Sequence, residues 1–200
     1  TPATKIIIDN QITSLLGHKK ANHMLFGQVS DTSKRIKELE VYWSGEIEDI
    51  TVKYKAKLDN TIFDYKGKLV YLNDLKSTGK PVSIFKQSFV SYRYYRQIAF
   101  YINAIFQYLI QIGEDPKEWS VVPRMVAVDN TPFYNVHTFT LDNKWIEAGH
   151  KEAQDLIRRV GWHIKNQEWK YSAEEVENKY DCHLDFTSKD QLFNGEDDGE

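Results

Sequence analysis

The segment 83–112 constrains the fold most, because its helical second half is apolar on nearly every side. From Tyr94 onward, large apolar side chains occupy all helical faces: Ile98, Phe100, Tyr101, Ile102, Ile105, Phe106, Leu109 and Ile110. A helix that is apolar all round is usually buried, and Gly113 and Pro116 end this one. The rest of the chain must therefore fold around it.

Strand-like segments before and after this helix can cover it. The patterns predict strands at 36–43, 50–58, 68–76, 120–128 and 133–141, and a short strand with a turn at 60–67. In the second segment, apolar residues alternate with Lys53, Lys55 and Lys57, so one face is apolar and the other basic. The third segment is almost continuously apolar, as for a strand covered on both faces.

Further helices flank these strands. The sequence predicts them at 4–26 with a break at Gly17, at 143–166 and at 172–179. In the first helix, one apolar face is formed by Ile7, Ile8, Ile12, Leu15 and Leu16. The order of elements predicts an α/β (α+β) fold, in which helices flank a mixed central sheet.

Length and composition narrow the organisation and the function classes. We expect one domain over 1–185 and an acidic, disordered tail over 186–200. The net charge is −3, so a nucleic-acid site would have to be a local basic patch. Cys182 stands alone, which excludes an internal disulfide and fits a reducing cytoplasm. No apolar run approaches the ~20 residues that span a bilayer, so we expect a cytoplasmic protein without a membrane partner.

Asp74-Leu75-Lys76 closes the third predicted strand, where residues two apart share a face. An acidic residue two before a lysine is a common pattern, found here at Asp64, Asp74, Asp115, Asp142, Glu168 and Glu177. Only Asp74 follows a strand-like apolar run. Phosphodiester hydrolysis needs carboxylates for Mg²⁺ and a group that serves the attacking water. Asp74 and Lys76 meet that need, although a surface ion pair at a strand end has the same pattern.

Three neighbouring features favour the catalytic interpretation. Asp59 ends the preceding long strand, which would place two carboxylates on adjacent strands. Gln97 and Tyr101 are four apart and so share one face of the buried helix. A glutamine in so apolar a helix needs a partner, because an unsatisfied buried amide is costly. Residues 77–79, which follow the lysine directly, read Ser-Thr-Gly.

Leu58-Asp59, then residues 74–78 (DLKST) and 94–101 (YYRQIAFY), resemble the RecE-type and lambda-exonuclease-like branch of the PD-(D/E)xK nucleases. The resemblance covers roughly residues 36–170, including the helix at 145–169, and its three motifs stand in the order and at the spacing of that family. It implies a restriction-endonuclease-like fold.

The resemblance also implies an activity and its site. The activity is that of a metal-dependent deoxyribonuclease with two bound Mg²⁺ or Mn²⁺ ions. It digests double-stranded DNA from its ends, 5′ to 3′, for recombination or repair in a bacterial or phage-infected cell. The implied roles are metal ligation by Asp59, Asp74 and the Leu75 carbonyl, service to the nucleophile by Lys76, and support of that lysine or contact with substrate by Gln97 and Tyr101. The implied partners are a single-strand annealing protein and further copies in a ring-like homo-oligomer. The segments 85–95 and 145–169 are richer in aromatic residues than a solvated surface needs, so they either form contacts between copies or pack in the core of the single chain.

Several residues keep two interpretations. Glu40 is either a third metal ligand, since the lambda-like branch uses an upstream glutamate, or an ordinary strand residue. Five basic residues either contact DNA phosphates or form solvated surfaces: Lys53, Lys55, Lys57, Arg93 and Arg96.

The sequence departs from the family pattern at two points. Leu58 replaces the usual proline before the first aspartate. The upstream Gly-x-x-x-His-like motif, whose histidine reaches the metal, is not found around His18 or His23, so a helix before Thr1 would have to supply it. A restriction-like endonuclease, or a nuclease fold kept for DNA binding or regulation without full activity, therefore remains as an alternative. One cysteine argues against relatives that bind an iron–sulfur cluster with four.

Overall fold

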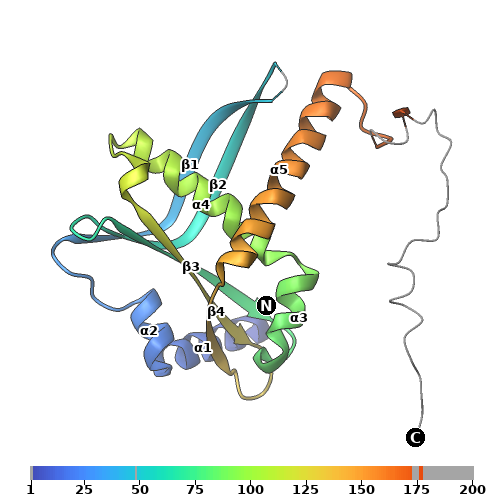
Figure 1. Ribbon diagram of the computed structural model, residues 1–200. Helices are drawn as coiled ribbons and strands as arrows, with labels where there is room; N and C mark the ends of the chain where they lie inside the picture. Colours follow the sequence, from blue (N-terminus) through green and yellow to red (C-terminus); the bar gives the residue numbers. More distant parts are fainter. Residues whose placement is uncertain (1, 48, 173–175, 178–200) are drawn as a thin grey trace, which may run out of the picture.

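The computed structural model describes residues 2–47, 49–172 and 176–177, and Figure 1 shows their arrangement. The elements are α1 (Pro2–Gly17), α2 (Lys19–Leu25), β1 (Ser33–Ile47), β2 (Ile50–Asp64), β3 (Leu69–Thr78), the 3₁₀ turn η1 (Val82–Ile84), α3 (Phe85–Ser91), α4 (Tyr94–Gln111), the 3₁₀ turn η2 (Pro116–Glu118), β4 (Ser120–Asp129), β5 (Val136–Thr140) and α5 (Asn143–Asn166).

A sheet of five strands, in the order β1-β2-β3-β4-β5, forms the centre of the molecule. β3 and β4 are parallel, and the other neighbouring strands are antiparallel. α3 and α4 connect the two parallel strands, because a parallel pair needs a crossover rather than a tight turn. The mixed sheet with flanking helices confirms the predicted fold class.

Two apolar clusters hold helices against the two faces of this sheet. Successive residues of β4 divide between them: Met125 and Ala127 pack with α4, whereas Val126 and Val128 pack with α1 and α2. A strand buried on both sides is apolar at consecutive positions, which explains the continuous runs in β3 and β4. The α4 cluster contains the larger side chains. One side of α4 is buried in it, whereas several of the predicted apolar residues are only partly buried and Ile110 is 54% exposed.

The predicted apolar face of the first helix is wrong in its extent. Ile8, Ile12 and Leu16 are 48%, 44% and 48% exposed, whereas Leu15 and the polar Gln11 are buried. The Gln11 amide donates to the Ser77 hydroxyl at 2.7 Å, so α1 meets the sheet along a narrow strip that includes a polar contact. The break at Gly17 is confirmed, since α1 ends there.

Two other boundaries differ from the sequence prediction. The helical zone 83–112 is divided into α3 and α4. Arg93, directly before α4, has a left-handed backbone conformation with a φ of 53°, so the two helices are not continuous. The short strand expected within 60–67 is the continuation of β2 to Asp64, so β2 is one long strand. The tail at 186–200 and most of the helix expected at 172–179 lie outside the described residues. Within the described part of the chain, no helix is both long and apolar enough to cross a membrane.

α5 crosses α4 at very short range through Gly149. A Cβ atom at this position would overlap the backbone carbonyl oxygen of Tyr95 and would lie 2.9 Å from the Ala99 Cβ. Glycine and alanine therefore let the two helix backbones approach. This contact fixes α4, which carries two of the predicted site residues.

Candidate active site

The predicted aspartates lie where β2 and β3 separate. Their antiparallel ladder ends at the pair Asn60–Asn73, and Asp59 and Asp74 are the next residue on each strand. Opposed residues on antiparallel strands have Cβ atoms about 5 Å apart while the ladder continues. The two carboxylates therefore lie side by side at the point where the strands begin to separate.

Backbone and lysine contacts fix each carboxylate. Asp59 Oδ2 accepts a hydrogen bond from the Leu75 amide at 2.9 Å, so Asp59 bridges the opening between the strands. Asp74 is only 1% exposed, and its Oδ1 accepts a hydrogen bond of 3.0 Å from Lys76 Nζ. Asp74 Oδ2 lies 2.8 Å from the same nitrogen, yet within the described structure it accepts no hydrogen bond. This buried carboxylate oxygen is therefore in an ion pair with Lys76, and a further ligand would share it with that ammonium.

The environment of Asp74 disfavours its charge. Burial raises the pKa of Asp74 to about 6, an effect that the positive charge of Lys76 opposes and the negative charge of Asp59 reinforces. A cation placed between the two aspartates would relieve both effects. The electrostatics therefore suit a metal site.

α4 contributes the polar pair that the sequence predicts for this site. The Gln97 amide donates to the Tyr101 hydroxyl at 2.9 Å, which gives the half-buried glutamine its partner. Burial, followed by the negative charge of Asp74, raises the pKa of Tyr101, and Asp59 adds to the shift. Tyr101 therefore lies close enough to both aspartates for their charges to affect its hydroxyl.

Tyr94 is a site neighbour that the sequence prediction missed. Lys76 Nζ lies 5.0 Å from the centre of the Tyr94 ring, a distance at which an ammonium is attracted to the ring face. Asp74 and Tyr94 thus hold the ammonium between them. The sequence signal was the position of Tyr94 at the start of the same helix as Gln97.

A second missed feature lies behind the aspartates, on the opposite face of the sheet. Asn60 and Asn73, the chain neighbours of Asp59 and Asp74, form a hydrogen bond of 3.3 Å with each other. Asn60 Oδ1 accepts from Arg35 at 2.9 Å, and the Arg124 Nε donates to Asn73 Oδ1 at 2.8 Å. The same side chains, except Arg124, also donate to carbonyl oxygens at the end of α2, including Met24 and Leu25. This network ties both aspartate-bearing strands to one helix.

Replacement of Asn73 with alanine should lower the free energy of unfolding by about 2 kcal/mol, because it leaves buried groups of Arg124 and α2 without partners. Asn143→Ala is the matched control, since Asn143 is exposed. Chemical denaturation of both variants measures the difference. Equal stability of the two would show that the network does not hold the strands.

Glu40 does not join the aspartates. Its carboxylate accepts from the Tyr42 hydroxyl at 2.5 Å and lies 3.7 Å from Lys55 Nζ on the exposed side of the hairpin. Across the described residues, no group of three or more His, Cys, Asp or Glu side chains is placed to hold a metal ion. A metal here would therefore take the two aspartates, a backbone carbonyl such as that of Leu75, and oxygens of water and substrate, a set that suits Mg²⁺.

The basic candidates are exposed or ion-paired. Lys57 lies 2.5 Å from Glu38, and Lys55 pairs with Glu40, while Lys53 is exposed on the same face. On the other side, Glu152 of α5 binds both predicted arginines: its carboxylate lies 2.8 Å from Arg93 and 3.7 Å from Arg96. Glu152, which the sequence prediction missed, also accepts from the Tyr95 hydroxyl at 2.7 Å.

Sequence comparison agrees with this geometry. Residues 16–180 match the profile of a family described as a PDDEXK-like domain of unknown function (DUF3799), and the chain belongs to that family. The membership confirms the predicted superfamily and, together with the fold, supports nuclease activity in general. No curated protein gives a significant match.

A solved structure shares the fold at low sequence identity. The crystal structure of a protein described as a putative exonuclease, from Eubacterium rectale, matches with a TM-score of 0.58 and 14% identity over 96% of this chain. This chain spans 66% of the length of that protein. The structure of SSO0001 matches with a TM-score of 0.39 and 13% identity over 78% of this chain and 61% of its own.

Proposed function

We propose that this protein hydrolyses phosphodiester bonds of DNA with the help of divalent cations. The observation that supports it most is the convergence of Asp59, Asp74 and Lys76 where β2 and β3 separate. Two carboxylates and one ammonium at a strand divergence form a minimal hydrolytic set. Asp74 Oδ2, which accepts no hydrogen bond from the described residues but lies 2.8 Å from the Lys76 ammonium, would offer this set a place for a cation.

Asp59, Asp74 and the carbonyl of Leu75 would hold the metal, with room for two Mg²⁺ or Mn²⁺ ions when substrate oxygens complete the coordination. Bound there, a divalent cation would neutralise charge on the scissile phosphate and lower the pKa of a water molecule. Asp74 Oδ2 would bind the cation at the expense of part of its ion pair with the Lys76 ammonium, which lies 2.8 Å away.

Lys76 would orient the attacking water. The side chain is only 16% exposed and is held from two sides by Asp74 and the Tyr94 ring. An ammonium with so little freedom can point a hydrogen-bonded water at the phosphate with little further ordering. Gln97 and Tyr101 would fix the floor of the site beside it.

Tyr101→Phe should reduce cleavage about tenfold, because it removes the hydroxyl that binds Gln97, a loss on the order of one hydrogen bond. Tyr108→Phe is the control, since Tyr108 lies on the same helix and packs near Phe63 and Tyr65, away from the aspartates. Initial rates on linear duplex DNA measure both variants. If both keep wild-type rates, the hydroxyl of Tyr101 has no part in the site.

We further propose that the substrate is the end of double-stranded DNA, degraded from 5′ to 3′ in recombination or repair beside a single-strand annealing protein. The family resemblance and the description of the Eubacterium rectale protein support an exonuclease. Phosphates would compete for Lys55, Lys57 and Arg93 with their present glutamate partners, while Lys53 and Arg96 would add charge near the same path.

Assembly into a ring would keep such an enzyme on DNA despite the net charge of −3. Most aromatic residues of the segment 85–95 pack within the single chain, as do Phe85 and Phe89. Tyr92 is 66% exposed and Trp169 is 65% exposed, so these remain candidate contacts between copies. Light scattering at micromolar protein would test this, since a strict monomer that still degrades long DNA processively would contradict the ring.

Digestion of linear duplex DNA labelled at either the 5′ or the 3′ end tests the proposed activity. We expect Mg²⁺-dependent loss of the 5′ label first, arrest by a chelator, and recovery with Mn²⁺. Closed circular duplex is the control substrate. Cutting of the circle would identify an endonuclease instead, and the absence of any cleavage with either metal would refute the proposal.

A further inference from the structure

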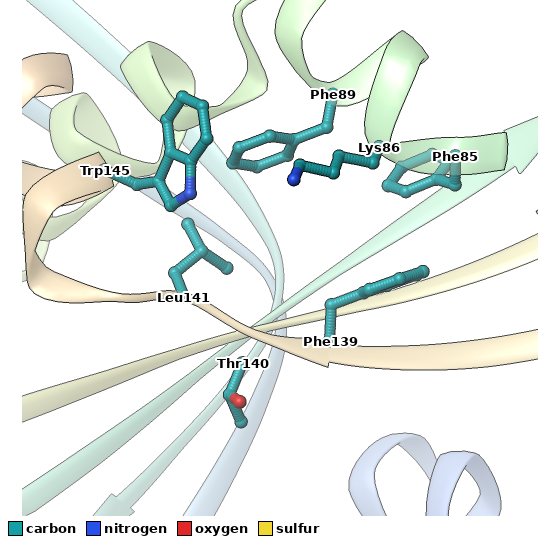
Figure 2. Close-up of a pocket in the computed structure, with 7 residues that line it drawn as sticks. All are labelled: Phe85, Lys86, Phe89, Phe139, Thr140, Leu141 and Trp145. Carbon is teal, nitrogen blue, oxygen red and sulfur yellow. The ribbon is translucent and has the colours of Figure 1, made fainter.

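A pocket with aromatic walls opens beside the proposed active site, between α3, β5 and the start of α5 (Figure 2). Its hollow is about 250 Å³ and is lined by Phe85, Lys86, Phe89, Phe139, Thr140, Leu141 and Trp145. Phe85 stacks on Phe139 with ring centres 5.2 Å apart, and Phe89 meets the edge of Trp145 at 5.2 Å. None of these residues has a role in the hydrolytic set described above.

Sheet register places this pocket close to the aspartates. Asp74 pairs with Met125 on β4, and Met125 pairs with Phe139 on β5, so the three residues form one row across the sheet. Neighbouring strands are about 4.8 Å apart, so Phe139 lies about 10 Å from Asp74 along this row. That distance equals about three base steps of a B-form strand.

Aromatic contacts also join the pocket to the catalytic lysine. The Tyr94 ring that faces Lys76 stacks on Phe85 with centres 5.9 Å apart. Phe85 in turn forms the pocket wall with Phe139. The stacked rings of Tyr94, Phe85 and Phe139 therefore run from the proposed active site, at Tyr94, to the pocket, at Phe139.

The pocket is open to solvent and has one positive charge. Phe85 and Phe89 are buried and form its inner wall, whereas Phe139, Leu141 and Trp145 are only partly buried. Figure 2 shows the Lys86 side chain lying along the α3 side of the pocket. Lys86 is exposed, and among the described residues no carboxylate lies within ion-pair distance of it.

We propose that this pocket binds an unpaired nucleobase at the end of the DNA, with Lys86 on an adjoining phosphate. The proposal rests on DNA being the substrate of the neighbouring site. Aromatic side chains stack on any base, because every base has a π-face, whereas a paired base is already stacked on its neighbours. Capture of a frayed or overhanging base within about three steps of Asp74 would hold one strand across the aspartates.

Fluorescence of 2-aminopurine measures this binding directly. The protein is the Asp74→Asn variant, without added metal, so that the DNA stays intact. One duplex has 2-aminopurine in a short unpaired overhang, and the other has it at a paired internal position. We expect quenching of the overhang probe on binding and little change of the internal probe. Binding of the overhang duplex without quenching would overturn the proposal.

Two further substitutions in the Asp74→Asn protein separate stacking from charge. Phe139→Leu keeps an apolar side chain but removes the aromatic face, and it should abolish most of the quenching and weaken overhang binding about tenfold. Lys86→Glu alters an exposed residue and should weaken binding of the overhang duplex more than that of a blunt duplex. Lys66→Glu is the matched control, because Lys66 is exposed in the turn between β2 and β3.

The outcomes also distinguish this inference from the proposed activity. Cleavage by the wild-type chain together with unchanged overhang binding by Phe139→Leu and Lys86→Glu would refute the pocket and leave the nuclease proposal intact. Quenching that depends on both residues, without cleavage by the wild type under any metal condition, would support the pocket and refute the hydrolytic role.

Discussion

Asp74→Asn is expected to lower metal-dependent DNA cleavage by at least about a thousandfold, because loss of one metal ligand removes several kcal/mol of transition-state stabilisation. The side chain is almost fully buried between Lys76 and the gap toward Asp59, so an amide of equal size keeps the packing. Initial rates with saturating Mg²⁺ measure the effect. Asp31→Asn is the control, as Asp31 is exposed in the turn before β1.

The same substitution should change the pH dependence of stability in the metal-free protein. The pKa of Asp74 in the folded chain, about 6, lies above the ordinary value, so the folded state holds this proton more tightly than the unfolded state does. The penalty of its charge is absent below about pH 4 and complete above about pH 6. Asparagine removes this penalty.

Urea denaturation at pH 4 and pH 8, with a chelator present, measures the effect. The stability of Asp74→Asn relative to wild type should rise by about 2 to 3 kcal/mol between the two pH values. Asp31→Asn should show no such rise. A flat difference for Asp74→Asn would mean that Asp74 is not a strained carboxylate, and unchanged cleavage would remove it from the active site.

Gly149→Ala should destabilise the fold by about 3 kcal/mol, the upper end of the cost of overpacking a core. The added methyl group meets the Tyr95 carbonyl and the Ala99 Cβ, and neither can move without displacing α4. Alanine is the better helix former by about 1 kcal/mol, so intrinsic propensity alone predicts the opposite sign. Denaturant unfolding of the variant decides between the two effects.

Gly17→Ala is the matched control, because a Cβ at Gly17 meets no atom within 4 Å. This variant should be as stable as the wild type or slightly more stable. Since α4 also positions Gln97 and Tyr101, Gly149→Ala should lose cleavage activity together with stability. If the variant is as stable as Gly17→Ala, the close crossing of α4 and α5 is not essential.

The elements with strong periodicity could be predicted from the sequence. The bounds of α5 agree with the predicted 143–166, and α4 contributes the largest share of the helical core, because an apolar pattern this long permits few alternatives. Asp74 and Lys76 share a face of β3, and Gln97 and Tyr101 form a contact pair, because each spacing fixes a direction within a single element.

Features that depend on contacts between elements could not be predicted in this way. Strict alternation along β2 places Asp59 on the same face as the lysines of that strand. In the structure, Asp59 follows the end of the β2–β3 ladder and accepts a hydrogen bond from the Leu75 amide. Nothing in the sequence distinguishes Asn60 and Asn73 from other polar residues, because their contact depends on the register that pairs them across β2 and β3. The division of α1 into exposed and buried sides likewise depends on where it meets the sheet.

β1 and β2 exchange faces at the position of Asp59. Ile36 packs with the α4 cluster, and the next core residue is Leu39, so two residues separate them where a regular strand has one. The register passes from Lys37–Asn60 to Leu39–Leu58 and keeps the same alignment on both sides. In related sequences, an insertion in the β1–β2 hairpin between Leu39 and Leu58 should therefore add equal numbers of residues to both strands. An unmatched single residue would turn the side chains beyond it to the other face of the hairpin.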